Sequence, residues 1–217
     1  MALVEDHVLM SAALSAALEA EGLRTVAPRP VALDEVREEL CRLGPSVALV
    51  DLDLGEAGRG TSLVAPLSAL GCRVVIVSGT SDEWAVGQCL ELGAVGWVPK
   101  TADLDRLVSV VWAALVGQPV TAEVEQTRLL EAWEVHRVER DRALAPFGSL
   151  SRAEVRVLAM LVDGTSAERI AEAGYVSVAT VRTQIRSVLS KLGVNSQLEA
   201  AALAHRVGWV PTETPDG

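Results

Sequence analysis

Short apolar stretches alternate with helix-like segments through the first half of the chain, and this alternation constrains the fold more than any other feature. The apolar stretches cover residues 2–4, 23–27, 47–50, 73–77 and 94–98. The helix-like segments between them cover residues 7–21, 32–42, 60–70, 81–92 and 102–116. Strands that alternate with helices of this length indicate βαβ units. We therefore expect an α/β fold with a doubly wound, five-stranded parallel sheet.

Four of the five expected strands end in a charged or hydroxyl side chain. Glu5 and Asp6 follow the first strand, Asp51 the third, Ser78 the fourth and Lys100 the fifth. Ligands of such sheets bind beyond the carboxyl ends of the strands. A single aspartate after a strand is usually a helix cap or a turn residue, but joint placement at four strand ends favours a shared site.

The residue types of this site indicate phosphoryl transfer. Clustered carboxylates repel one another unless a hard cation binds them, and Mg²⁺ prefers oxygen ligands. The hydroxyl of Ser78 and the ammonium of Lys100 are suited to hold the oxygens of an anion that lies over Asp51. Asp51 is then the candidate nucleophile.

Charge and cysteine content limit the class of protein. The net charge of −10 is concentrated in residues 1–116, which carry −8, whereas residues 147–217 are neutral and therefore comparatively basic. The three cysteines have no metal-like spacing, which indicates reduced thiols in a cytoplasmic protein. No signal peptide is visible, and the longest apolar run is too short to span a bilayer, so we expect no membrane contact.

The second half of the chain is helical throughout. Ser151 and Glu154 form a potential capping box at the start of a first helix, which Gly164 ends. Three more helix-like segments follow, and the third helix begins after Ser177 and ends at Gly193. Short helices and a tight turn before a helix rich in Arg, Thr and Gln indicate a four-helix module with a helix-turn-helix.

The third helix of this module separates apolar from polar positions. Val181, Ile185 and Val188 can point inward. Arg182, Thr183, Arg186 and Lys191 remain on the outward side. Arginine pairs with guanine edges in the major groove, and threonine contacts bases or methyl groups. On charge alone, a solvated basic surface is the favoured interpretation of this face.

Residues 117–147 connect the two halves. Glycine and proline lie at both ends of this segment, and neither occurs within 121–143. The interior has high helix propensity, and Thr121 is a suitable N-cap. We expect a linker helix of five or six turns, and the alternative is an extended linker.

The motifs of the first half resemble the flavodoxin-like receiver domain of two-component response regulators. The matching stretches are "LVEDH", "ALVDLDLG", "VVIVSGT" and "GAVGWVPK". The resemblance implies that Asp51 accepts a phosphoryl group from a sensor histidine kinase. It implies that Mg²⁺ is bound by Asp6, Asp51 and the backbone carbonyl of Asp53, and that Glu5 holds a metal-bound water.

The same resemblance assigns the remaining residues of the site. Ser78 and Lys100 would hold the phosphoryl oxygens, and Ser78 would also act in the conformational switch. Trp97 stands where the family keeps a switch aromatic, usually Phe or Tyr, and the alternative is an ordinary strand aromatic. Gly55 stands where the family often has Pro.

Residues 148–207 resemble the LuxR-type DNA-binding domain. The matching stretches are "LSRAEVRVLAML", "GTSAERIAE" and "VSVATVRTQIRSVLSKLGVNSQLEAAALA". The resemblance places Arg182, Thr183 and Arg186 toward bases. It places three further residues near phosphates: Thr180, Lys191 and Ser196. Gln184 and Gln197 depart from the His and Arg that the family usually carries.

Together these features resemble the NarL/FixJ class of response regulators. The expected parts are a receiver domain (1–116), a linker (117–147), a DNA-binding domain (148–210) and a tail (211–217). The class implies a cytoplasmic, double-stranded-DNA-binding regulator that is a homodimer when active. Phosphorylation would alter the face formed by the helix at 81–92, the strand at 94–98 and the helix at 102–116.

Two rival interpretations remain. The first is a phosphorylation-independent regulator whose receiver serves as a dimerisation or protein-binding scaffold. The second is a small α/β enzyme such as a phosphatase, which the single-turnover chemistry of a receiver and the attached helical module both disfavour. We therefore expect a phosphoacceptor with at most slow self-dephosphorylation, not an enzyme.

Overall fold

The computed structural model describes residues 1–29, 32–79 and 83–211. The chain forms two compact units, Met1–His136 and Arg137–Gly217. Residues 81 and 82 of one expected helix, and residues 212–217 of the expected tail, lie outside the described residues.

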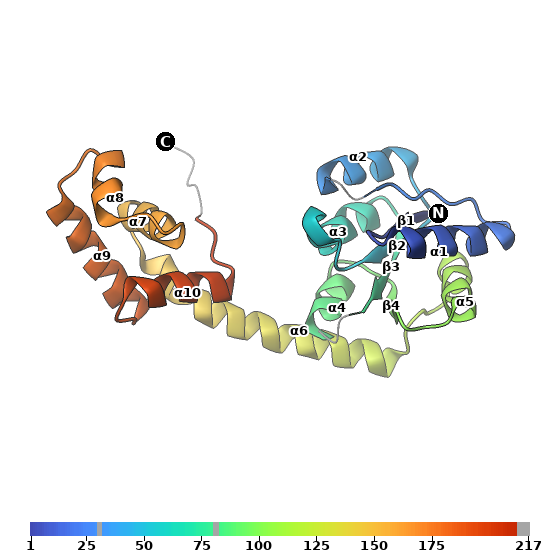
Figure 1. Cartoon of the computed structure of the whole chain (residues 1–217). Coiled ribbons are helices and arrows are strands. Elements are labelled where there is room, and N and C mark those ends of the chain that lie inside the picture. The colour runs from blue at the N-terminus through green and yellow to red at the C-terminus, as the bar shows by residue number, and fades with distance from the viewer. Residues whose placement is uncertain (30–31, 80–82, 212–217) are drawn as a thin grey trace. The chain divides into compact units, whose positions relative to one another are not determined.

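The first unit is built on a parallel sheet of four strands with the order β1-β2-β3-β4 (Figure 1). The strands are β1 (Ala2–Val4), β2 (Val47–Asp51), β3 (Arg73–Ser78) and β4 (Gly96–Pro99). All neighbouring pairs run parallel, as predicted. Their carboxyl ends therefore lie along one edge of the sheet.

The prediction of five strands is wrong by one. In the segment 23–27, only Val26 joins the sheet, as an isolated bridge to Ala2. Val26 exchanges backbone hydrogen bonds with Met1 and Leu3. The next donor along this parallel ladder belongs to residue 28, which is proline and has no N–H. The ladder therefore stops after one residue.

Helices cover both faces of the sheet, which confirms the doubly wound architecture. One face packs against α1 (Val8–Ala20) and α5 (Leu104–Leu115). The other packs against α2 (Leu33–Leu43), α3 (Thr61–Ala69) and α4 (Glu83–Glu91). Successive strand residues point to opposite faces, so the strands need apolar residues throughout.

A long helix, α6 (Glu123–Leu144), follows α5 and runs from the first unit into the second (Figure 1). It occupies the segment for which the absence of glycine and proline favours a helix. Leu129 and Trp133 are its buried residues, and both belong to the first unit. The N-terminal part of α6 is therefore a packed element of that unit.

The second unit is helical, as predicted. A short 3₁₀ helix (Ala145–Ser149) leads into four α-helices. These are α7 (Arg152–Val162), α8 (Ala167–Ala173), α9 (Val178–Leu192) and α10 (Gln197–Val207). The predicted capping box of Ser151 and Glu154 is present. Among the described helices of either unit, none combines the length and apolarity needed to cross a lipid bilayer.

Candidate functional site

Acidic side chains from the ends of β1 and β2 meet at the carboxyl edge of the sheet. Glu5, Asp6, His7 and Asp51 each offer one ligand atom, and these atoms lie within 4.8 Å of one another. Lys100, directly after β4, reaches into the same cluster. Its Nζ lies 2.5 Å from Asp51 Oδ2 and 3.0 Å from Glu5 Oε1. The structure thus brings together residues from three of the predicted strand ends.

Burial determines the electrostatics of this cluster. Asp51 and Glu5 are 2% and 5% exposed. Burial raises the pKa of the Asp51 carboxyl, and the hydrogen bond from Lys100 only partly opposes this rise. Burial would lower the pKa of Lys100, but hydrogen bonds to Asp51 and Glu5 outweigh it and raise that pKa. Two buried carboxylates thus share one ammonium group, and negative charge remains uncompensated.

His7 belongs to this cluster, although the sequence analysis did not single it out. Its Nδ1 lies 2.8 Å from Glu5 Oε1 and 2.7 Å from Asp6 Oδ1. The hydrogen bond to Glu5 and the charge of Asp6 raise the pKa of the imidazole. The sequence feature that could have indicated this role is the position of His7 directly after Glu5 and Asp6.

The donor set suits a hard divalent cation. Asp6 Oδ1 is buried and, apart from its ion-pair contact with His7 Nδ1, has no hydrogen-bond partner within the part of the chain that the structure describes. Carboxylate oxygens at this spacing are the ligands that Mg²⁺ prefers. Asp53, whose backbone carbonyl is a predicted ligand, has an exposed side chain. Its N–H donates to Asp51 Oδ1 at 3.2 Å, which holds the loop close to the cluster.

Two glycines allow this loop to pass close to the carboxylates. A Cβ at Gly60 would lie 1.9 Å from the backbone oxygen of Asp51, so no side chain fits there. Gly55 has φ +59°, and a Cβ there would lie 3.0 Å from Asp6 Oδ2. Proline, with φ fixed near about −65°, cannot adopt this conformation. The departure from the family pattern at Gly55 therefore accompanies a loop that only glycine forms easily.

Ser78 and Trp97 belong to the neighbouring strands β3 and β4. Ser78 ends β3, is 2% exposed and pairs in register with Pro99, and its backbone oxygen accepts the N–H of Lys100 at 2.9 Å. Trp97 in β4 is half-buried and packs against the core formed with α2, α3 and α4. Its N–H donates to Thr121 Oγ1 at 3.0 Å, a contact with the connecting segment that the sequence pattern does not reveal.

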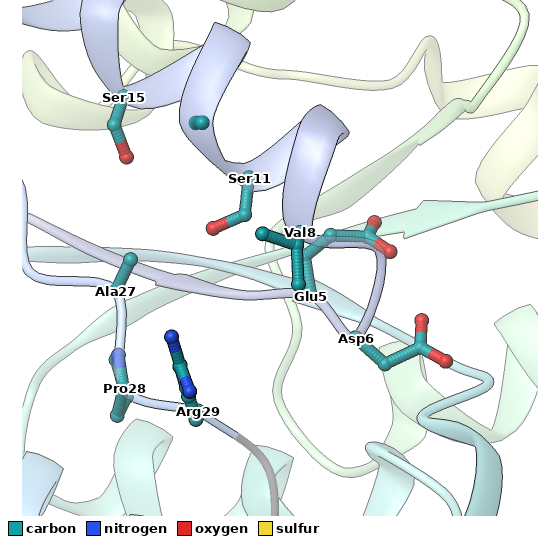
Figure 2. Close-up of a pocket in the computed structure, with 9 residues that line it drawn as sticks. Glu5, Asp6, Val8, Ser11, Ser15, Ala27, Pro28 and Arg29 are labelled. Atoms are coloured by element: carbon teal, nitrogen blue, oxygen red, sulfur yellow. The ribbon is translucent and has the colours of Figure 1, made fainter.

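A cavity of about 460 Å³ lies next to the acidic pair, between α1 and residues 27–29. Figure 2 shows Ser11 and Ser15 on α1 across from Ala27 and Arg29. Glu5 and Asp6 line one end of this cavity, but Asp51 and Lys100 do not. The cavity is therefore distinct from the point at which the charged groups converge.

A second candidate site is the outer face of α9. Val181, Ile185, Val188 and Leu192 are buried, and the predicted base-contacting residues are exposed: Arg182, Thr183 and Arg186. This division agrees with the predicted inward and outward faces. Arg182 Nη2 lies 3.5 Å from Glu168 Oε1, an exposed pair that contributes little to stability.

The predicted phosphate-contacting residues already have partners within the second unit. The Ser196 hydroxyl caps α10, and the Thr180 hydroxyl contacts Ser177 Oγ at 2.9 Å. Lys191 Nζ donates to Glu154 Oε2 at 2.7 Å and to the backbone oxygen of Ser149 at 2.9 Å. The ammonium of Lys191 therefore has an internal contact as well as an exposed surface.

Glu154 is the buried centre of that contact. Burial would raise its pKa, but hydrogen bonds from Lys191, Ser187 and Ser151 outweigh burial and lower the pKa to about 2. The Ser187 hydroxyl donates to Oε1 at 2.6 Å, and the Ser151 N–H donates to Oε2 at 2.6 Å. The carboxylate is thus bonded on both oxygens.

Two family models match the chain. Residues 1–112 match the response regulator receiver domain. Residues 148–204 match the bacterial regulatory proteins of the luxR family. The matches coincide with the two regions that carry the acidic cluster and the exposed basic helix.

Relatives with this arrangement match nearly the whole chain. The transcriptional regulatory protein LiaR of Bacillus subtilis is 27% identical, covering 94% of this chain and 95% of that protein. The response regulator UvrY of Escherichia coli is 26% identical, covering 98% of this chain and 96% of that protein.

Solved structures of RcsB support the fold. The response regulator RcsB of Salmonella typhimurium has a TM-score of 0.50 at 22% identity, over 96% of this chain and 97% of that one. An RcsB–DNA complex also has a TM-score of 0.50 at 22% identity, over 94% of this chain and 96% of that one.

Proposed function

The chain belongs to the response regulators that join a receiver domain to a LuxR-type DNA-binding domain, and we propose that phosphorylation of Asp51 controls this regulator of transcription. The donor is a sensor histidine kinase. An Asp51 oxygen forms the bond to phosphorus while the bond from phosphorus to the histidine nitrogen breaks. The observation that carries this proposal is the convergence of Lys100, Asp51 and Glu5 at 2.5 and 3.0 Å.

The roles of the neighbouring groups follow from their charges. Asp6, Asp51 and the backbone carbonyl of Asp53 would hold Mg²⁺, with Glu5 on a metal-bound water. When bound, the ion would supply positive charge that opposes the rise in the Asp51 pKa and screens the incoming phosphoryl oxygens. Lys100 and Ser78 contribute an ammonium and a hydroxyl to those oxygens, and Ser78 and Trp97 adjust to their presence.

The DNA-binding role is assigned to α9. Arg182, Thr183 and Arg186 would contact bases, and we place three residues near phosphates: Thr180, Lys191 and Ser196. We infer that the active protein is a cytoplasmic homodimer on paired half-sites of double-stranded DNA. We assign residues 1–116 to the receiver, 117–147 to the linker and 148–210 to the DNA-binding domain.

Intact-mass spectrometry with a small phosphodonor and Mg²⁺ tests the phosphoacceptor. Wild-type protein should gain one phosphoryl group that is stable in acid and labile in base. Asp51→Asn should gain none while it remains folded. Glu56→Gln, which alters an exposed carboxylate in the same loop, is the matched control and should be labelled like the wild type.

The same samples separate the proposal from its rival when they are titrated onto DNA. Labelling that changes DNA affinity in wild-type protein, and no change in Asp51→Asn, supports control by phosphorylation. DNA binding without any incorporation of phosphate would favour the phosphorylation-independent scaffold instead.

Alanine variants of α9 test the DNA-reading residues. Arg182→Ala or Arg186→Ala should cost roughly 1–3 kcal/mol per half-site on specific duplexes and relax the base preference. Lys191→Ala also breaks the pair with Glu154, so it is assayed where circular dichroism shows it folded; there it should weaken specific and scrambled duplexes alike and reduce the salt slope by about one. Arg152→Ala, an exposed arginine on α7, is the control. Equal losses for the arginine variants on both duplexes would mean that they contact only the backbone.

A further inference from the structure

The first half of α6 is packed tightly against α4. Leu129 and Trp133 of α6 are 1% and 6% exposed. A Cβ at Gly87 of α4 would lie 2.0 Å from the backbone oxygen of Leu129, so the two helix backbones approach at a distance that only glycine permits. We call this close contact between α4 and α6, at Gly87 and Leu129, the α4–α6 seam.

Polar contacts also join α6 to both ends of α4. Trp133 Nε1 donates to Oε2 of Glu91, the last residue of α4, at 2.5 Å. Arg128 forms an ion pair with Glu83, the first residue of α4. These contacts fix the position of α6 along α4 as well as its distance.

A stack of three side chains connects the same seam to the loop that follows Asp51. The guanidinium of Arg59 lies over the Trp84 ring at 5.7 Å. The Trp84 ring stacks on His136 of α6, with centroids 4.0 Å apart and an interplanar angle of 6°. The backbones of Arg59 and Asp53 form an isolated antiparallel β-bridge. The N–H of Asp53 in turn donates to Asp51 Oδ1. Backbone contacts therefore link Asp51 to Arg59, and side-chain contacts link Arg59 to α6.

We propose that the Arg59–Trp84–His136 stack transmits the phosphorylation state of Asp51 to α6, and that phosphorylation loosens the first half of α6 from α4. This inference rests on the proposed function. A phosphoryl group carries about two negative charges and three acceptor oxygens. Charge-assisted hydrogen bonds to such oxygens are stronger for a guanidinium than contact with an aromatic face. Arg59, on the adjoining loop, therefore leaves Trp84 when the group is added.

Removal of Arg59 from the stack acts on α6 through Trp84. Without the guanidinium, Trp84 loses the contact that holds its ring against His136. The Trp133–Glu91 hydrogen bond, the Arg128–Glu83 ion pair and the Leu129 contact then hold α6 without the stack. Since α6 continues into the second unit, its release changes the freedom of the chain that leads to the DNA-binding domain.

Hydrogen exchange on the full chain, with phosphoramidate and Mg²⁺ as the probe, tests this coupling. The backbone amides of residues 126–136 should exchange about two- to fivefold faster after phosphorylation, the scale of one exposed cation–π contact. Arg59→Ala should already exchange faster without the phosphodonor and should show no further increase. Arg42→Ala, an exposed arginine on α2, is the matched control and should behave as the wild type.

The phosphoryl group is measured by mass in the same samples, so the two proposals can fail separately. Incorporation with unchanged or slower exchange in 126–136 would overturn the coupling and leave the phosphoacceptor role intact. Arg59→Ala that responds to phosphorylation like the wild type would overturn the role of the stack. A lack of incorporation would overturn both proposals.

Discussion

Each domain contains a buried carboxylate paired with a lysine, and the two pairs behave in opposite ways. In the receiver, Asp51 is 2% exposed and lies 2.5 Å from Lys100. In the DNA-binding domain, Glu154 is 6% exposed and lies 2.7 Å from Lys191. The pKa of Asp51 is raised, mainly by burial, whereas that of Glu154 is lowered to about 2.

The difference lies in the number of partners that each carboxylate has. Asp51 shares its lysine with Glu5 and accepts the Asp53 N–H at the long distance of 3.2 Å. Glu154 accepts a hydroxyl, a backbone N–H and an ammonium. A carboxylate with unmet bonding capacity is suited to bind a cation and react, whereas a fully bonded one is suited to hold helices together.

The largest expected effect comes from Glu154→Gln. The neutral amide loses its charge-assisted hydrogen bonds and leaves Lys191 without a carboxylate, so the free energy of unfolding of the second unit should fall by about 2–3 kcal/mol. Urea unfolding, combined with hydrogen exchange of α7 and α9, measures this loss. Glu172→Gln, at an exposed site on α8, should have no measurable effect. An unchanged urea midpoint in Glu154→Gln would mean that the pair of Glu154 and Lys191 does not stabilise the domain.

The contributions of Asp51 and Glu154 to stability should depend on pH with opposite signs. The folded-state pKa of Glu154, about 2, lies below its ordinary value of 4.5, so its stabilisation is complete above pH 4.5 and is lost as the pH falls toward 2. The folded-state pKa of Asp51 is raised, so its contribution is present below its ordinary value of 3.8 and is lost as the pH rises.

Unfolding of each domain across the acid range measures this difference, with hydrogen exchange resolving the two. Glu154→Gln should flatten the acid loss in the second unit and leave the first unit unchanged. If the second unit of Glu154→Gln still lost stability at low pH, other carboxylates would be responsible for that loss.

The smallest expected effect is a gain in stability from Asp51→Asn. The substitution removes a buried charge that repels Glu5, while Lys100 keeps its contact with Glu5. The free energy of unfolding of the receiver should rise by about 1 kcal/mol or less, the scale of an ordinary single substitution. Thermal unfolding measures it, with Glu56→Gln as the control. A fall in melting temperature would mean that Asp51, like Glu154, stabilises its domain.

The sequence predicts that the charged side chains of the receiver converge, because these residues stand at strand ends. Glu5, Asp51 and Lys100 are far apart along the chain, but parallel pairing brings the ends of their strands to one edge. The pair of Glu154 and Lys191 could not be predicted in this way. The two residues are 37 positions apart on different helices, and only the packing of α7 on α9 brings them together.

Elements without a periodic signal were predicted less well. The apolar stretch 23–27 resembles a strand, but the proline at position 28 limits it to one bridge. High helix propensity indicated the helix now seen as α6 but not its partner, because the close approach of Gly87 to Leu129 depends on tertiary packing alone. The contact of Thr121 with Trp97 has the same origin.

The close contact at Gly87 also determines what a single mutation at this position can change. A glycine codon becomes an alanine codon by one base change, and the methyl group so gained would lie 2.0 Å from the Leu129 oxygen. One mutation can therefore disturb the packing of α6 while every residue assigned to phosphoryl transfer and to DNA reading stays as it is. Under the proposed coupling, position 87 gives the gene a short route to altered regulation with the chemistry conserved.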